Sequence, residues 1–113
     1  MIGYELHEDK LMKVIHVVVN DKMTLEQARK FAEDYKSLTK SIDTRSYVLD
    51  IDCTAMKVVT PDLIDNLSET LKMYKQPGFH KVIMKVRHNN ILKMQLTRLS
   101  REAELTNVEI INV

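Results

Sequence analysis

Hydrophobic and polar residues follow two different periods along the chain, and each change of period marks a new segment. Short runs of β-branched and apolar residues predict five β-strands, at residues 4–7, 11–19, 47–52, 81–87 and 108–113. Between the later strands, apolar residues recur every three or four positions, which predicts three amphipathic helices. Their stripes are Leu25, Ala28, Phe31, Tyr35, Leu38 and Ile42; then Leu63, Ile64, Leu67, Leu71 and Tyr74; then Leu92, Leu96, Leu99 and Ala103.

Capping residues support the start of each predicted helix. Thr24 precedes the first stripe and Gln27 follows three residues later, which is the pattern of a capping box. Thr60 stands before Pro-Asp and is the expected N-cap of the second helix, because Pro suits the first helical position. Asn89 or Asn90 is the expected cap of the third helix.

The predicted order is β-β-α-β-α-β-α-β, which indicates one α/β domain over residues 1–113. Strands that alternate with helices favour a mostly parallel sheet, while the first two strands form an N-terminal β-hairpin with a turn at residues 7–10. The strand at residues 11–19 is apolar on both sides, as are the two central strands. We therefore expect helices to cover the sheet on both faces.

Composition narrows the class of protein. The chain has 113 residues, of which 44% are hydrophobic and 29% charged, as in globular soluble domains. One cysteine excludes a disulfide scaffold, and two glycines exclude a glycine-rich phosphate loop. No apolar run approaches membrane-spanning length, and the polar N-terminal segment lacks the apolar core of a signal peptide. The expected location is the cytoplasm.

Charge is balanced in total but divided along the chain. Residues 70–101 contain no acid and hold eight of the 17 Lys and Arg residues, so the remainder carries a net charge of −7. This division suits either an ordinary solvated face or a docking surface for an acidic partner. Nucleic acid is not expected as a partner, because the net charge is only +1 and few aromatic residues accompany the basic ones.

No residue cluster indicates catalysis, so we expect a non-enzymatic protein without cofactor or metal. Asp50 and Asp52 with Thr54 resemble the Asp-x-Asp-x-Thr signature of haloacid dehalogenase-like phosphatases, but the acidic pair that this family needs after a later strand is missing, since no acid stands between Glu69 and Glu102. In the structural alternative, these aspartates cap the following loop. The four histidines lack ligand spacing, and Cys53 is expected to be a buried thiol.

The element order resembles the STAS domain (sulfate transporter and anti-sigma factor antagonist) over essentially the whole chain. The best local match is YVLDIDCTAMKVVTPDLIDNL at residues 47–67, where the strand Tyr-Val-Leu-Asp-Ile corresponds to the family's Val-Leu-Asp-Leu. The family's phosphorylated Asp-Ser-Ser-Gly sequence is absent, and Thr60 is the hydroxyl at the corresponding place.

This resemblance implies a protein-interaction or regulatory module of the kind that works in bacterial sigma-factor control, switched by phosphorylation of Thr60. A regulatory protein would bind at the start of the second helix and at basic positions of the third. The expected partner-binding residues are Thr60, Asp62, Asp65, Lys93, Arg98 and Arg101. The alternative function is a carrier of lipid or another small apolar ligand, as suspected for a motif-poor branch of similar folds.

The third helix is apolar over a wider arc than its core stripe requires. Ile91 and Met94 lie off the stripe formed by Leu92, Leu96 and Leu99. An exposed apolar patch of this kind is typical of a contact surface, so a homodimer or a contact with a partner protein is a further expectation.

Overall fold

The computed structural model describes residues 4–20 and 24–113 and contains one five-stranded sheet with three α-helices in that part of the chain. The elements in order are β1 (Tyr4–Asp9), β2 (Val14–Val19), α1 (Leu25–Lys40), β3 (Val48–Asp52), α2 (Ile64–Lys75), β4 (Lys81–Val86), α3 (Asn90–Glu102) and β5 (Val108–Asn112). Two 3₁₀ turns, η1 (Thr44–Ser46) and η2 (Pro61–Leu63), precede β3 and α2.

The strands lie in the sheet in the order in which they occur in the sequence, β1-β2-β3-β4-β5. β1 pairs with β2 antiparallel, and every later pair is parallel. These findings confirm the predicted α/β class, the N-terminal hairpin and the mostly parallel sheet.

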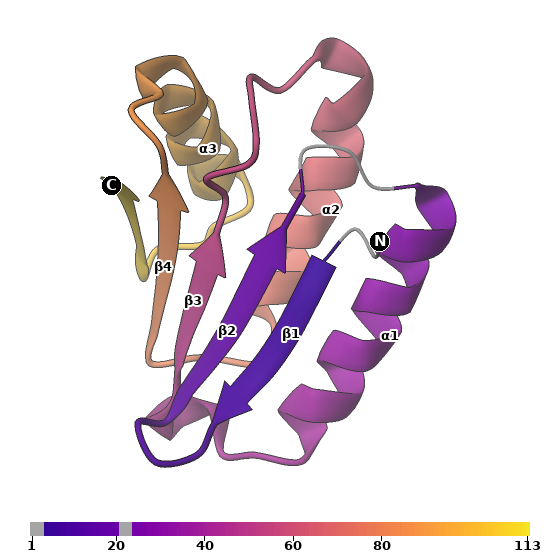
Figure 1. Cartoon of the computed structure of the whole chain (residues 1–113), viewed down its shortest axis with the longest axis vertical. Helices are drawn as coiled ribbons and strands as arrows, with labels where there is room; N and C mark the ends of the chain where they lie inside the picture. Colours follow the sequence, from indigo (N-terminus) through magenta and orange to yellow (C-terminus); the bar gives the residue numbers. More distant parts are fainter. Residues whose placement is uncertain (1–3, 21–23) are drawn as a thin grey trace.

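All three helices lie on one face of the sheet (Figure 1). Each β-α-β connection moves by one strand in the same direction, and right-handed connections then place every helix on the same side. Burial alternates accordingly: Ile15, Val17, Leu49, Ile51, Val82 and Met84 are at most 1% exposed, while the residues between them are half-buried. The expectation that helices cover both faces is therefore wrong.

The hairpin turn lies further along the chain than the sequence pattern predicts. β1 continues to Asp9, so residues 7–9 belong to a strand, and β2 begins only at Val14. Leu11 and Met12 occupy the turn and are 91% and 69% exposed. The Asp9 carboxylate accepts a hydrogen bond from the Met12 backbone N–H at 3.0 Å, which stabilises the turn.

Two of the three predicted caps are confirmed. Thr24 and Gln27 form the reciprocal capping box of α1, and the Asn89 side chain accepts from the Leu92 N–H at the start of α3. Thr60 occupies the N-cap position of η2 with extended backbone, and Pro61 follows it as predicted, but the Thr60 side chain makes no cap bond. The Thr60 hydroxyl instead donates a hydrogen bond to the Asp62 carboxylate.

Aromatic rings join the helices to the covered face of the sheet. The Phe31 ring of α1 lies 5.0 Å from the Tyr4 ring of β1, and Tyr35 meets Tyr74 of α2 edge to face at 5.6 Å. Phe79, before β4, completes this cluster beside Tyr35. The Phe31 and Tyr35 rings both contact the Tyr74 ring, so the cluster joins α1 to α2.

Candidate functional site

A groove of about 590 Å³ runs between α1 and α2 and reaches down to the sheet; we call it the α1–α2 groove. Its floor includes Ile51, Cys53 and Met84 from β3, the following loop and β4, together with Leu96 from α3. All four side chains are buried. A volume of this size is within the range of small-molecule sites, which are mostly apolar with a few polar groups.

Small side chains on α1 leave the space that forms the groove. Ala28 and Ala32 line the groove one turn apart on the face of α1 that points toward α2. The opposing wall on α2 includes Leu67, Thr70 and Met73, which are only partly buried. Because alanine cannot reach across to α2, space remains between the two helices at these positions, whereas Phe31 and Tyr35 contact Tyr74 of α2.

Basic side chains stand at the rim of the groove. Arg29 and Lys36 are exposed residues of α1, and Lys72 is an exposed residue of α2. The Lys72 ammonium also pairs with the Glu69 carboxylate at 3.4 Å. The rim thus combines three positive charges with one negative charge above an apolar floor, an arrangement that favours a ligand with an apolar body and an anionic end.

The loop between β3 and α2 closes one end of the groove and is anchored to α3. The Gln95 side chain accepts from the Val59 backbone N–H at 2.8 Å and donates to the Val59 carbonyl at 2.9 Å. Met56 and Val58 line the groove beside this anchor. The paired hydrogen bonds fix the loop in the absence of regular secondary structure.

Cys53 is buried as the sequence predicts, and it lies in the floor of the groove. Its side chain is 3% exposed, and burial raises the pKa of the thiol to about 12, with a further contribution from the Asp52 carboxylate. At neutral pH the sulfur is therefore a neutral thiol and not a nucleophile.

We expect alkylation of Cys53 by iodoacetamide at pH 8 to be at least about 100-fold slower in the folded protein than in urea, because only the thiolate reacts and burial suppresses it. Mass spectrometry of timed samples measures both rates. Equal rates in the two states would show that the groove floor is open to solvent and the thiol is ionised.

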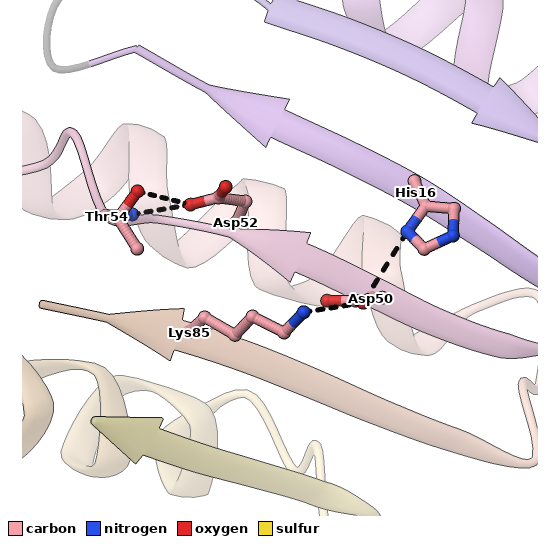
Figure 2. A network of polar contacts seen from close by, with 5 residues as sticks. All are labelled: His16, Asp50, Asp52, Thr54 and Lys85. Atoms are coloured by element: carbon pink, nitrogen blue, oxygen red, sulfur yellow. Dashed lines mark hydrogen bonds and ion pairs between the residues drawn. The ribbon is translucent and has the colours of Figure 1, made fainter. Parts of the chain in front are cut away.

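The face of the sheet without helices carries a polar network at its centre (Figure 2). The Asp50 carboxylate accepts from the Lys85 ammonium at 3.0 Å and lies 3.5 Å from Nδ1 of His16. These residues come from β3, β4 and β2, which are neighbours in the sheet. Asp50 is 14% exposed, and both contacts go to its Oδ2, whereas its buried Oδ1 has no hydrogen-bond partner, so the cost of burying this charge is only partly offset.

Asp52 points to the same face as Asp50, as alternation along a strand requires, but has a separate role. Its carboxylate accepts hydrogen bonds from the Thr54 backbone N–H at 2.9 Å and from the Thr54 hydroxyl at 2.6 Å (Figure 2). Burial acts to raise the pKa of Asp52, but these bonds and the charges of Lys85 and Arg87 outweigh it, and the pKa is lowered. The expected loop-capping role is thus confirmed for Asp52.

Because the pKa of Asp52 is lower in the folded chain, its bonds to Thr54 stabilise the fold above the unfolded pKa of about 4 and are lost as pH falls through the folded pKa. We expect Thr54→Ala to lower the free energy of unfolding by about 1 kcal/mol at pH 7 and by less at pH 3. Urea unfolding at both pH values measures this difference. Thr39→Ala is the control, since the Thr39 hydroxyl donates to a backbone carbonyl, and its effect should not change with pH.

The structure brings together some of the sequence-predicted partner-binding residues. Thr60 and Asp62 are exposed just before α2, Asp65 lies in the first turn of α2, and the Gln95–Val59 hydrogen bonds fix this segment to α3. Lys93 lies in the first turns of α3, on the same end of the molecule. Arg98 follows further along the helix, and Arg101 lies in its last turn, away from Thr60.

The predicted apolar patch of α3 is exposed. Ile91 is 62% and Met94 is 71% exposed, while Leu92, Leu96 and Leu99 are buried. Over residues 4–20 and 24–113, no three His, Cys, Asp or Glu residues cluster so that they could hold a metal ion. Among the same residues, no helix has the length and hydrophobicity to cross a membrane.

No protein-family model, curated protein or solved structure matches this chain. Function is therefore inferred from the geometry. The feature with the clearest chemistry is the α1–α2 groove, which sequence reasoning did not locate. Its signal in the sequence is a pair of alanines one turn apart on the first helix, Ala28 in the predicted stripe and Ala32 beside it.

Proposed function

We propose that this chain is a non-enzymatic binding protein that holds a single-chain amphiphile, an apolar chain with an anionic head group, in the α1–α2 groove. Of the two functions expected from the sequence, this is the ligand carrier. The observation that carries the proposal is the groove of about 590 Å³, with Ile51, Met84 and Leu96 in its floor. A well-filled interface between α1 and α2 would have favoured the other function.

The positive charges of Arg29, Lys36 and Lys72 at the rim of the groove are the reason for proposing an anionic head group. A chain lying between Ala28, Ala32 and Leu67 would place its polar end near Arg29 at one end of the groove or Lys36 and Lys72 at the other. A carboxylate there gains charge-assisted hydrogen bonds, which an alcohol or alkane of equal length lacks. No metal or cofactor takes part in the proposal.

Isothermal titration calorimetry with dodecanoate and dodecanol tests this function. We expect saturable binding of dodecanoate with one site per chain, and binding of dodecanol at least about 10-fold weaker, as expected for the loss of one charge-assisted interaction. Binding of both with equal affinity would remove the role of the rim. Absence of binding by either compound, with the protein folded, would contradict the proposal.

As a second candidate function, we propose the STAS-like regulatory role, in which the chain binds a regulatory protein in the cytoplasm. The β-β-α-β-α-β-α-β order supports the resemblance. The favouring observation is the Gln95–Val59 anchor, which holds the exposed Thr60 hydroxyl next to α3 and its exposed Ile91 and Met94. Phosphorylation of Thr60 would place a dianion beside Asp62 and disrupt the existing hydrogen bond.

Affinity capture from the native host tests the regulatory role. We expect the wild-type chain to capture one protein that is lost with Thr60→Glu and with the triple reversal of Lys93, Arg98 and Arg101 to Glu. Thr106→Glu is the control, because Thr106 is exposed and lies beyond α3. Capture that is unchanged by both sets of substitutions would exclude this surface.

A further inference from the structure

No described helix covers the face of the sheet opposite α1, α2 and α3, here called the open face (Figure 1). Mostly parallel sheets are normally covered on both faces, because their strands are apolar on both sides. The open face of this sheet is mixed: charged and polar residues alternate there with five half-buried aliphatic residues that are not part of the core, namely Val14, Val18, Val48, Ile83 and Ile111. A surface of this kind is typical of an interface.

Charge on the open face is divided by strand. β3 contributes the carboxylates Asp50 and Asp52, whereas the neighbouring β4 contributes the ammonium groups of Lys81 and Lys85. Glu109 on β5 pairs with Lys81 at 2.7 Å. Between these two neighbouring strands, the boundary between carboxylates and ammonium groups thus runs along the strand direction, and β5 adds one carboxylate beyond β4.

The strand register arranges these residues in levels. One level contains Val18, Asp52, Lys85 and Ile111, which are paired across β2, β3, β4 and β5. The next level contains His16, Asp50, Ile83 and Glu109. A second copy turned over onto this face would present the same four residues of each level in the reverse order, from β5 to β2.

We propose that two copies of this chain form a two-fold dimer by packing their open faces together, with the axis parallel to the strands along the boundary between β3 and β4. This rotation keeps each residue at its level and places β3 opposite β4 of the second copy, and β2 opposite β5. Asp52 then faces Lys85 of the second copy, and Val18 faces Ile111. In the next level, His16 faces Glu109, and the contact is self-complementary as a two-fold interface must be.

The other symmetric arrangement is unfavourable. A two-fold axis perpendicular to the strands would place β3 on β3 and β4 on β4, so carboxylates would face carboxylates and lysines would face lysines. Charge therefore selects the axis parallel to the strands. In this arrangement Asp50 faces an aliphatic residue, Ile83, and it retains Lys85 and His16 of its own sheet as partners.

The dimer is independent of the ligand proposal, because the α1–α2 groove opens on the helical side of the sheet. It also differs from a contact through Ile91 and Met94, which lie on α3. The two sheets would stack about 10 Å apart with their strands within about 30° of each other, as in aligned sheet packing.

Sedimentation equilibrium of charge-exchange variants tests the dimer. We expect the wild-type chain to be dimeric, and we expect Asp52→Lys alone and Lys85→Glu alone to weaken the dimer by about 100-fold or more, since each places like charges opposite one another twice. The double variant, Asp52→Lys with Lys85→Glu, restores opposite charges and should restore the dimer. Circular dichroism identifies any variant that fails to fold, and Val18→Lys then replaces it as the disruptive single substitution.

The matched control variants have the same changes of charge at residues outside the open face. Asp65→Lys on α2 and Lys93→Glu on α3 should leave the dimer intact. A monomeric wild-type chain, a double variant as monomeric as the single variants, or a dimer lost through Met94→Glu on α3 would each overturn the proposal.

Discussion

Replacing Ala32 with phenylalanine is expected to abolish binding of dodecanoate while leaving the chain folded. Ala32 lines the middle of the α1–α2 groove and is only partly buried, so a larger side chain can enter the groove without displacing the core. The phenyl ring would occupy the space of the bound chain. We expect affinity to fall by at least about 100-fold, as for other steric exclusions from a ligand site.

Ser37→Phe is the matched control for this substitution. Ser37 is an exposed residue of the same helix and does not line the groove. Calorimetry should show normal dodecanoate binding by the control and none by Ala32→Phe. If both variants bound equally well, the amphiphile would lie elsewhere and the groove would lose its proposed role.

The largest loss of stability is expected for Leu96→Ala. Leu96 is fully buried on α3 and contributes to the groove floor, so its truncation removes contacts with both the sheet and the groove wall. Deletions of this size in well-packed cores lower the free energy of unfolding by about 2–5 kcal/mol.

Urea unfolding followed by circular dichroism measures this loss. Ile91→Ala is the control on the same helix, since Ile91 is 62% exposed and its truncation should change the free energy of unfolding by no more than about 0.5 kcal/mol. A cost for Leu96→Ala as small as that of Ile91→Ala would show that α3 does not pack on the sheet as described.

The element order could be predicted from the sequence because helices and strands have different periods. The stripe containing Phe31 and Tyr35 and the box of Thr24 with Gln27 both formed as expected. The hairpin turn could not be located, because Leu11 and Met12 are apolar and continue the pattern of the strand. β2 begins at Val14 because only the residues from there on pack against the neighbouring strands, and the apolar character of Leu11 and Met12 does not reveal this.

The uncovered face of the sheet was missed for a related reason. Val14, Val48 and Ile83 suggested strands that are apolar on both sides, but His16, Asp50 and Lys85 alternate with the core residues in the same strands. This alternation is the sequence signal of a face that no helix covers. The α1–α2 groove and the polar network could not be predicted from the sequence, because both depend on how far apart the helices and strands lie in space. The groove exists because Ala28 and Ala32 face α2, and the network around Asp50 exists because the register aligns three strands.

The strictly sequential strand order has a consequence for how the chain reaches its structure. Each β-strand of the parallel part docks against the one that was added just before it, so no pairing must wait for a distant part of the polypeptide. Loop closure is then short at every stage, which lowers the entropic barrier for a fold with parallel pairing. The chain can therefore fold by adding one strand at a time, from one edge strand of the sheet to the other.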